Sequence, residues 1–178
     1  MGLDMYFYLK EKRPVEGWAK GSDDEYKSFG HWNAEAGVPD ETNYPEDIKE
    51  LAEYIFKINF KSNHINDEGF RLYQVGYFRK FNALHSYLVN TLADGIDECQ
   101  DIEITKNDLF TLLDKLSKVN DNHDLADSEL PTASGFFFGG TNYDEWYFND
   151  IKEAIEMCEL FLTKIDFDKY DLIYQASW

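Results

Sequence analysis

One stretch in the last third of the chain constrains the fold more than any other part. Residues 130–147 contain six aromatic side chains and three glycines between a proline and the start of a long amphipathic segment. Phe136 to Phe138 is too short and too aromatic for a helix and has glycine on both sides, which predicts a short buried strand. Gly139 and Gly140 allow backbone conformations closed to other residues. The stretch therefore predicts a strand, a glycine turn and a helix start in close succession.

Apolar periodicity divides much of the remaining chain into strands and helices. Alternation predicts strands, and helical spacing predicts helices, one of which begins with a capping box of Thr105 and Asp108. The elements mix without a βαβ repeat, so we expect one α+β domain over residues 1–178, with a small, mainly antiparallel sheet and about four helices packed on one face. The predicted strands cover residues 3–9, 102–104 and 170–177, and the predicted helices cover residues 46–58, 75–92, 105–119 and 143–164.

The predicted elements are separated by three polar stretches. Residues 10–45 form a long irregular excursion that is rich in glycine and proline, and segments of such length are usually functional or mobile. Residues 63–69 predict a polar break, and residues 120–129 predict an acidic loop. The excursion also carries aromatic side chains that we expect to dock on the core or on a partner, namely Trp18, Tyr26, Phe29 and Trp32.

The charge of the chain is strongly negative and unevenly distributed. The formal net charge is −18, and residues 94–178 contribute −14 of it from 20 acidic and 6 basic side chains. Such a chain repels nucleic acid phosphates and anionic membranes, so we expect no direct binding of free nucleic acid and no membrane association, while basic surfaces attract it. The candidate partner-binding carboxylates are Asp94, Asp97, Glu98, Asp101 and Glu103. The competing interpretation of these five residues is a solvated acidic face.

Cysteine usage and the N-terminal sequence bear on the compartment. Cys99 and Cys158 have no metal-binding or redox spacing, which argues against a disulfide framework and a zinc site. The N-terminal residues have no basic region before an apolar run, and no apolar run approaches membrane-spanning length. We therefore expect a cytoplasmic protein.

Polar residues on the predicted helix over residues 75–92 are candidates for chemistry. His85 is suited to a general base or a metal ligand, but it lies on the apolar face, where a hydrogen-bonded core histidine is the competing interpretation. On a helix, Arg79 and Asn82 lie one turn apart and can contact one partner. That partner is either a phosphate or the pair Asp144 and Glu145. The competing interpretation is a structural salt bridge that joins this helix to the last one.

Asp144 and Glu145 are the other candidate catalytic residues, together with Arg79 and His85. Two carboxylates can hold a divalent metal, as in a nuclease. Adjacent residues of a helix point in different directions, however, and acidic residues in a first turn are also favoured by the helix dipole. The chain lacks zinc-protease, nucleotide-binding and serine-hydrolase motifs, so we expect no cofactor and assign no metal. Tyr143 and Trp146, next to these acids, are candidate partner contacts.

Several motifs together resemble a family of small proteins from phages, prophages and other mobile elements of bacteria. The matching stretches cover most of the chain outside residues 10–45. They are Met1 to Tyr6, Gly76 to His85, Asp94 to Cys99, Leu130 to Thr132, Ser134 to Gly139 and Tyr143 to Tyr147.

The resemblance implies a function in host manipulation. In size and acidity the chain is also similar to inhibitors of type II CRISPR–Cas9, which implies an anti-CRISPR protein that binds the host's Cas9 or its guide RNA complex in the bacterial cytoplasm. Cas9 holds nucleic acid in positively charged channels, which an acidic surface can occupy. The alternative is a metal-assisted nuclease that acts on guide RNA, or an inducer of guide RNA cleavage. A structural protein of the element is a third alternative, and the sequence does not define an oligomeric state.

Overall fold

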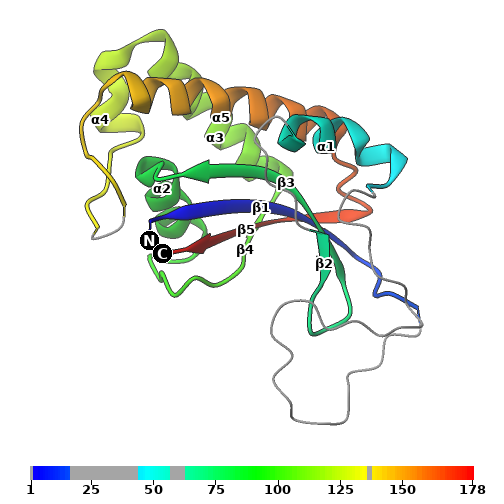
Figure 1. The fold of residues 1–178 in the computed structure, drawn as a ribbon. Coiled ribbons are helices and arrows are strands. Elements are labelled where there is room, and N and C mark those ends of the chain that lie inside the picture. The colour runs from blue at the N-terminus through cyan, green and yellow to red at the C-terminus, as the bar shows by residue number, and fades with distance from the viewer. Residues whose placement is uncertain (1, 17–43, 57–62, 136–137) are drawn as a thin grey trace.

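The computed structural model describes residues 2–16, 44–56, 63–135 and 138–178 (Figure 1). Within these ranges, five antiparallel strands form one sheet in the order β2-β3-β1-β5-β4. The strands are β1 (Asp4–Glu11), β2 (Asn63–Ile65), β3 (Arg71–Arg79), β4 (Ile102–Ile104) and β5 (Tyr170–Ser177). The first and last strands pair along their whole length, so the two ends of the described chain lie side by side.

Helices cover one face of this sheet. They are α1 (Lys49–Phe56), α2 (Asn82–Leu92), α3 (Lys106–Asp121), α4 (Ala126–Glu129) and α5 (Glu145–Lys164), with short 3-10 helices η1 (Glu46–Ile48) and η2 (His123–Leu125). In Figure 1 the long helix α5 crosses the molecule with α1 and α3 on the same side of the sheet. The predicted α+β class is therefore confirmed. In the described ranges, no helix combines the length and the apolar character needed to cross a bilayer.

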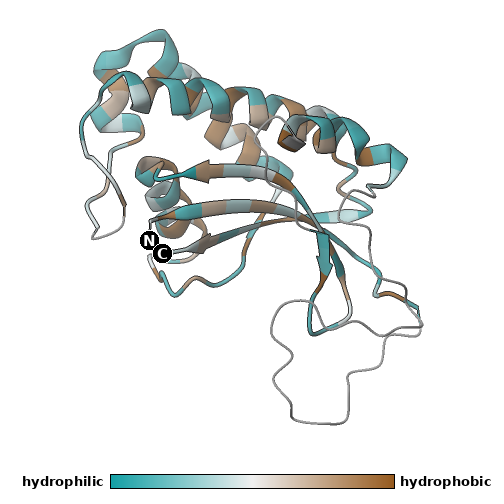
Figure 2. Ribbon diagram, in the orientation of Figure 1, coloured by the Kyte–Doolittle hydropathy of each residue, from teal (hydrophilic) through white to brown (hydrophobic). Residues whose placement is uncertain are grey.

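The main core lies between the sheet and these helices. Met5, Phe7 and Leu9 alternate along β1 and are completely buried, which is the burial expected of every second residue of a strand. On α5, Ile151 and Phe161 are among the residues that pack against them. Figure 2 shows the corresponding pattern, with hydrophilic residues along the outer side of α5. The core thus follows directly from the two apolar periodicities.

A glycine in β3 sets the distance between the sheet and α5. A Cβ atom on Gly76 would lie 2.9 Å from the Sδ atom of Met157 and 3.1 Å from the Cβ atom of Phe7. The first distance is shorter than real Cβ contacts and the second is unusually short, so a larger residue here would force Met157 of α5 or Phe7 of β1 to shift. The register between β1 and β3 also shifts beside this position, between Phe7 and Tyr8.

The predicted helix over residues 75–92 is wrong in its first part. Residues 75–79 belong to β3, and α2 begins only at Asn82. The turn between them is made by Lys80, whose φ of 63° is in the left-handed region. Phe78 and Phe81 are both buried, one in the strand and one just before the helix, so their spacing fits a helical period without being helical. Arg79 and Asn82 therefore do not lie one turn apart on a helix.

Other boundaries differ less. Asn63 to Ile65 form β2 rather than a polar break, because they pair with Arg71 to Tyr73 in a hairpin. Residues 120–129 are not a loop, since they hold the end of α3, η2 and α4. The predicted strand at Phe136 to Phe138 falls partly outside the described residues, and Phe138 itself lies in a bend.

Most of the remaining predictions agree closely. Of the predicted helix over residues 46–58, residues 46–56 form η1 and α1, and residues 57–58 lie outside the described residues. Strands β1, β4 and β5 lie where alternation predicted them, and the capping box of Thr105 and Asp108 is formed. The last helix begins at Glu145, two residues later than expected. The four aromatic side chains of the excursion lie outside the described residues.

Candidate functional site

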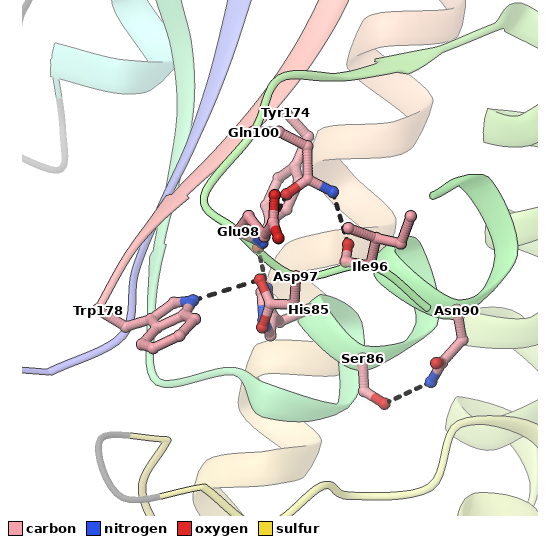
Figure 3. A network of polar contacts seen from close by, with 9 residues as sticks. All are labelled: His85, Ser86, Asn90, Ile96, Asp97, Glu98, Gln100, Tyr174 and Trp178. Atoms are coloured by element: carbon pink, nitrogen blue, oxygen red, sulfur yellow. Dashed lines mark hydrogen bonds and ion pairs between the residues drawn. The ribbon is translucent and has the colours of Figure 1, made fainter. Parts of the chain in front are cut away.

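His85 is the centre of a buried polar network (Figure 3). Its ring is only 1% exposed, with Nδ1 2.7 Å from the Tyr174 hydroxyl and Nε2 3.0 Å from Oδ2 of Asp97. The indole Nε1–H of Trp178 donates to Oδ1 of the same carboxylate at 3.3 Å. Both ring nitrogens of His85 are thus engaged, so the arrangement favours a hydrogen-bonded core histidine over a metal ligand or an accessible base.

The environment of Tyr174 keeps its hydroxyl protonated. Burial raises the pKa of this hydroxyl well above its ordinary value, and the nearby Asp97 carboxylate adds to the effect. The hydroxyl therefore stays protonated, and it can donate to Nδ1 in the His85 tautomer whose Nε2–H donates to Asp97. Through this chain of bonds, β5 and α2 together hold the segment that contains Asp97.

The segment of residues 94–103, named here the acidic segment, has a fixed backbone. Asp94 and Cys99 have φ values of 52° and 57°, both in the left-handed region. The Gln100 side chain donates to the Ile96 carbonyl at 2.5 Å and accepts from the Glu98 amide at 2.7 Å. These local bonds act together with the anchor at Asp97, so we regard the segment as pre-shaped rather than as a loose connection.

The carboxylates of the acidic segment do not have equivalent environments. Asp97 is used internally, and Asp101 accepts a hydrogen bond from Gln175 at 3.2 Å. Asp94, Glu98, Asp101 and Glu103 are exposed. Within the described ranges, none of these four has a lysine or arginine nitrogen within 4.0 Å. Four of the five predicted partner-binding carboxylates are therefore available to a partner.

A second candidate site is a cleft of about 310 Å³ at the start of α5, named here the α5 cleft. Its lining includes basic, acidic and aromatic side chains from β3, α2 and α5. The charged ones are Arg79, Lys80, Asp144 and Asp150, and the polar side chain of Asn82 also lines the cleft. The aromatic ones are Phe81, Trp146 and Tyr147. The structure thus brings together Arg79, Asn82 and Asp144, as the sequence suggested, although Arg79 reaches the cleft from a strand. His85 and Glu145 are not part of its lining.

Asn82 has a structural role in this cleft. Its Nδ2 donates to the carbonyls of Phe138 and Gly140 at 3.0 and 2.8 Å, and its Oδ1 accepts from the Ala133 amide at 3.0 Å. The residue is 3% exposed, and these three bonds join the first turn of α2 to the glycine-rich loop. Asn82 therefore holds this loop, which contains Gly135, Gly139 and Gly140, against the start of α2.

Asp144 caps α5. Its Oδ1 accepts from the backbone amides of Trp146 and Tyr147 at 3.1 and 3.2 Å. This bonding satisfies two amides that have no partner inside the helix, which is the usual function of an N-cap. Glu145 follows in the first turn and is exposed.

The two aromatic candidates near this helix differ in their contacts. Tyr143 is half-buried, and its hydroxyl donates to Oδ1 of Asp127 at 2.9 Å, which ties it to α4. Trp146 is 79% exposed at the cleft. Of these two, only Trp146 is placed to meet a partner with most of its ring.

Asp150 is a cleft residue that sequence reasoning missed. Partial burial, together with the negative charges of Glu153 and Asp144, raises its pKa from 3.8 to about 7. The position had a signal, because Asp150 lies three residues after the buried Tyr147 and four before the buried Ala154. That spacing puts a carboxyl group at the border of the apolar face.

The cleft has mixed electrostatics. Arg79 Nε lies 3.7 Å from Oδ1 of Asp4, so part of its charge is already balanced. Asp144 and Asp150 contribute two carboxyl groups. Among the described residues, no group of three histidine, cysteine, aspartate or glutamate side chains is arranged to hold a metal ion. A divalent ion would therefore depend on two carboxylates and on the ligands of a bound substrate.

Comparisons of the chain with protein-family models, curated proteins and solved structures found no match. The resemblance to mobile-element proteins therefore rests on the motifs of the sequence.

Proposed function

We propose that the protein is an anti-CRISPR protein of a phage or another mobile element, which inhibits a type II-A Cas9 by binding Cas9 or its guide RNA complex. The contact surface in this proposal is the acidic segment. The observation that carries the proposal is the set of four exposed carboxylates on a backbone of fixed shape, namely Asp94, Glu98, Asp101 and Glu103. Such a protein acts in the cytoplasm of the host bacterium.

The fixed shape supports a binding role. A loop that must order on binding loses conformational freedom, whereas a pre-shaped loop loses little. His85 and Trp178 both form hydrogen bonds with the Asp97 carboxylate. The Gln100 side chain bonds the Glu98 amide and the Ile96 carbonyl of the same segment. The exposed carboxylates around these residues can therefore present a defined pattern of negative charge to a partner.

The charge supports a basic partner. The channels of Cas9 that hold nucleic acid are positively charged, and an acidic surface that enters them competes with phosphates. Charges exposed at the rim of an interface mainly accelerate association and set specificity, and they weaken with salt. The proposal therefore predicts that binding weakens as the salt concentration rises. It also predicts that the protein inhibits without catalysing a reaction.

Charge reversal tests the surface. The variant Glu98→Lys, Asp101→Lys, Glu103→Lys changes the acidic segment, and Asp121→Lys, Glu156→Lys, Glu159→Lys is a control with the same change in net charge on exposed residues of α3 and α5. We expect the first variant to bind Cas9 with guide RNA at least about tenfold more weakly at 0.1 M salt, and the control to change binding far less. Equal weakening would remove the acidic segment as the contact surface.

One observation favours the alternative function, a metal-assisted nuclease that acts on guide RNA. Arg79 and Asp144 line one cleft together with Asp150, and two carboxyl groups beside a guanidinium can serve a divalent metal and a phosphate. The helix-capping role of Asp144 weighs against it.

RNA cleavage separates the two functions. Guide RNA is incubated with the purified protein and Mg²⁺ or Mn²⁺, with and without Cas9, and the RNA is run on a denaturing gel. Cleavage by the protein alone that is lost in Asp150→Asn and in EDTA would establish the nuclease. Cleavage only in the presence of Cas9 would make the protein an inducer of cleavage. Intact RNA under all conditions is the result that the binding proposal expects.

A further inference from the structure

Trp178 stands at the border between the core and the acidic segment. Its side chain is 43% exposed, although its Nε1–H is bonded to Oδ1 of Asp97 (Figure 3). On the inner side, the centroid of its ring lies 6.0 Å from that of Phe138, with the ring planes at 77°. The indole is therefore fixed by a hydrogen bond and by an edge-on aromatic contact, while nearly half of it remains in solvent.

A fixed and exposed indole is well suited to anchor a partner. Tryptophan is enriched among the residues that dominate binding energy, and its large ring has few rotatable bonds to freeze. Here the ring is already oriented by Asp97, so binding would immobilise little more of it. The structure thus presents an aromatic ring that is oriented before any partner binds.

The charges around the ring select the chemistry of the ligand. Trp178 follows β5 directly and shares Asp97 with His85, and Gln175 of β5 donates to Asp101. Tryptophan is the best aromatic acceptor of a cation, and adjacent carboxylates attract the same cation. In the described ranges, no lysine or arginine lies over this ring, since the cation–π contacts are those of Lys10 with Phe70 and Lys169 with Tyr170.

One basic side chain of the protein itself, that of Arg79, lies near this end of the sheet. In the sheet, Asp4 of β1 lies opposite Ser177 of β5 on one side and opposite Arg79 of β3 on the other. Arg79 also forms an ion pair with Asp4, so its guanidinium is directed to that carboxylate. The acidic segment, in contrast, has four exposed carboxylates without such a neighbour among the described residues, which keeps the local preference for a cation.

We infer that Trp178 is an anchoring residue whose ring receives the guanidinium of an arginine from a basic segment of a partner protein, with the neighbouring carboxylates of the acidic segment binding its positive charge. This inference rests on the proposed function, because it specifies the chemistry of the partner surface. A nucleic acid base could stack on the same ring, but its phosphates would be repelled by the Asp97 carboxylate bonded to the indole and by the negative charge of the acidic segment.

A hexa-arginine peptide tests the inference without Cas9. Binding is followed by calorimetry at low salt and by the indole N–H resonance of Trp178 in a nitrogen-15 spectrum. We expect the Trp178 resonance to shift, and Trp178→Leu to weaken binding about fivefold. Trp178→Phe, which retains a ring, should recover part of the loss. Phe110→Leu, at an exposed aromatic residue of α3, is the control and should bind as the wild type does, and the amide spectrum checks that each variant folds.

The outcomes distinguish this inference from the proposed function. Failure of the peptide to bind, unchanged binding by Trp178→Leu, or an equal loss in Phe110→Leu would overturn it. Tighter binding of a ten-nucleotide oligouridylate than of the peptide would also overturn it, in favour of base stacking. If the peptide requires Trp178 while Cas9 does not bind, the inference stands and the choice of Cas9 as target fails.

Discussion

His85 Nε2 lies 3.0 Å from Oδ2 of Asp97, so a buried histidine of α2 holds the acidic segment against the sheet. The other ring nitrogen contacts the Tyr174 hydroxyl, and Asp97 in turn orients Trp178. One side chain therefore connects the core of the protein to the surface that we propose for binding.

Replacing His85 with leucine should destabilise the protein through its polar partners. The Tyr174 hydroxyl is buried and the Asp97 carboxylate is mostly so, and both would lose a hydrogen bond. We expect the free energy of unfolding, measured with urea, to fall by about 3 kcal/mol. In a cycle with Asp97→Ala, the two effects should not add, because both changes remove the hydrogen bond between His85 and Asp97. A loss below about 0.5 kcal/mol would show that the network does not support the fold.

Replacing Asn82 with alanine should release the glycine-rich loop from α2. The change removes three hydrogen bonds to Ala133, Phe138 and Gly140. We expect a loss of about 2 kcal/mol in unfolding free energy and faster hydrogen exchange at the Ala133 amide. Asn90→Ala on the exposed side of the same helix is the control. An equal effect there would contradict the role of Asn82 in holding the loop.

Two glycine substitutions should give opposite results. Gly76→Ala places a methyl group 2.9 Å from Met157 Sδ, so we expect a loss of about 2 kcal/mol from overpacking. Gly140→Ala meets nothing within 4 Å and should be nearly neutral. Thermal unfolding of both variants measures the difference. Equal melting temperatures would mean that α5 does not approach β3 as closely as the structure places it.

Asp150 should make stability depend on pH. Its pKa in the folded protein is about 7, above the ordinary value of 3.8, so the folded state retains a proton that the unfolded state releases between these values. Its contribution therefore favours folding at low pH and is lost as the pH rises from about 4 to about 7. Asp150→Asn lacks this loss, and because water reaches part of the carboxyl group, we expect the variant to gain about 1 kcal/mol over the wild type at pH 8.

Urea unfolding at several pH values measures this difference. The gain of Asp150→Asn should shrink to zero near pH 4, where Asp150 is protonated in both states. Glu159→Gln, an exposed carboxylate on the same helix, is the control and should show a level difference across the range. A level difference for Asp150→Asn as well would contradict the raised pKa.

Local patterns were sufficient for much of the fold. The alternation of β1 and β5, the capping box at Thr105 and the apolar stripe of α5 each depend on residues close in sequence, and each is confirmed. The region around Lys80 was not predictable in this way. A left-handed turn at a lysine separates β3 from α2, and the apolar residues on both sides imitate one continuous helix.

The candidate sites depended more on tertiary structure. The sequence suggested that Arg79, Asn82 and Asp144 lie together, and in the fold all three line one cleft. The side chains of Asn82 and Asp144, however, already form structural hydrogen bonds. Trp178 carried no signal beyond its place at the end of an alternating strand. Its importance comes from Asp97, which is 81 residues away in sequence.

The most direct test of the proposed function is gel filtration of the purified protein with Cas9, with and without guide RNA, followed by a denaturing gel of the RNA. The proposal predicts that the protein elutes with Cas9 or with its guide complex and that the RNA remains intact. The complex should dissociate as salt is raised, because the contact depends on charge. Separate elution of the protein and Cas9 under low salt, with or without guide RNA, would contradict the proposal.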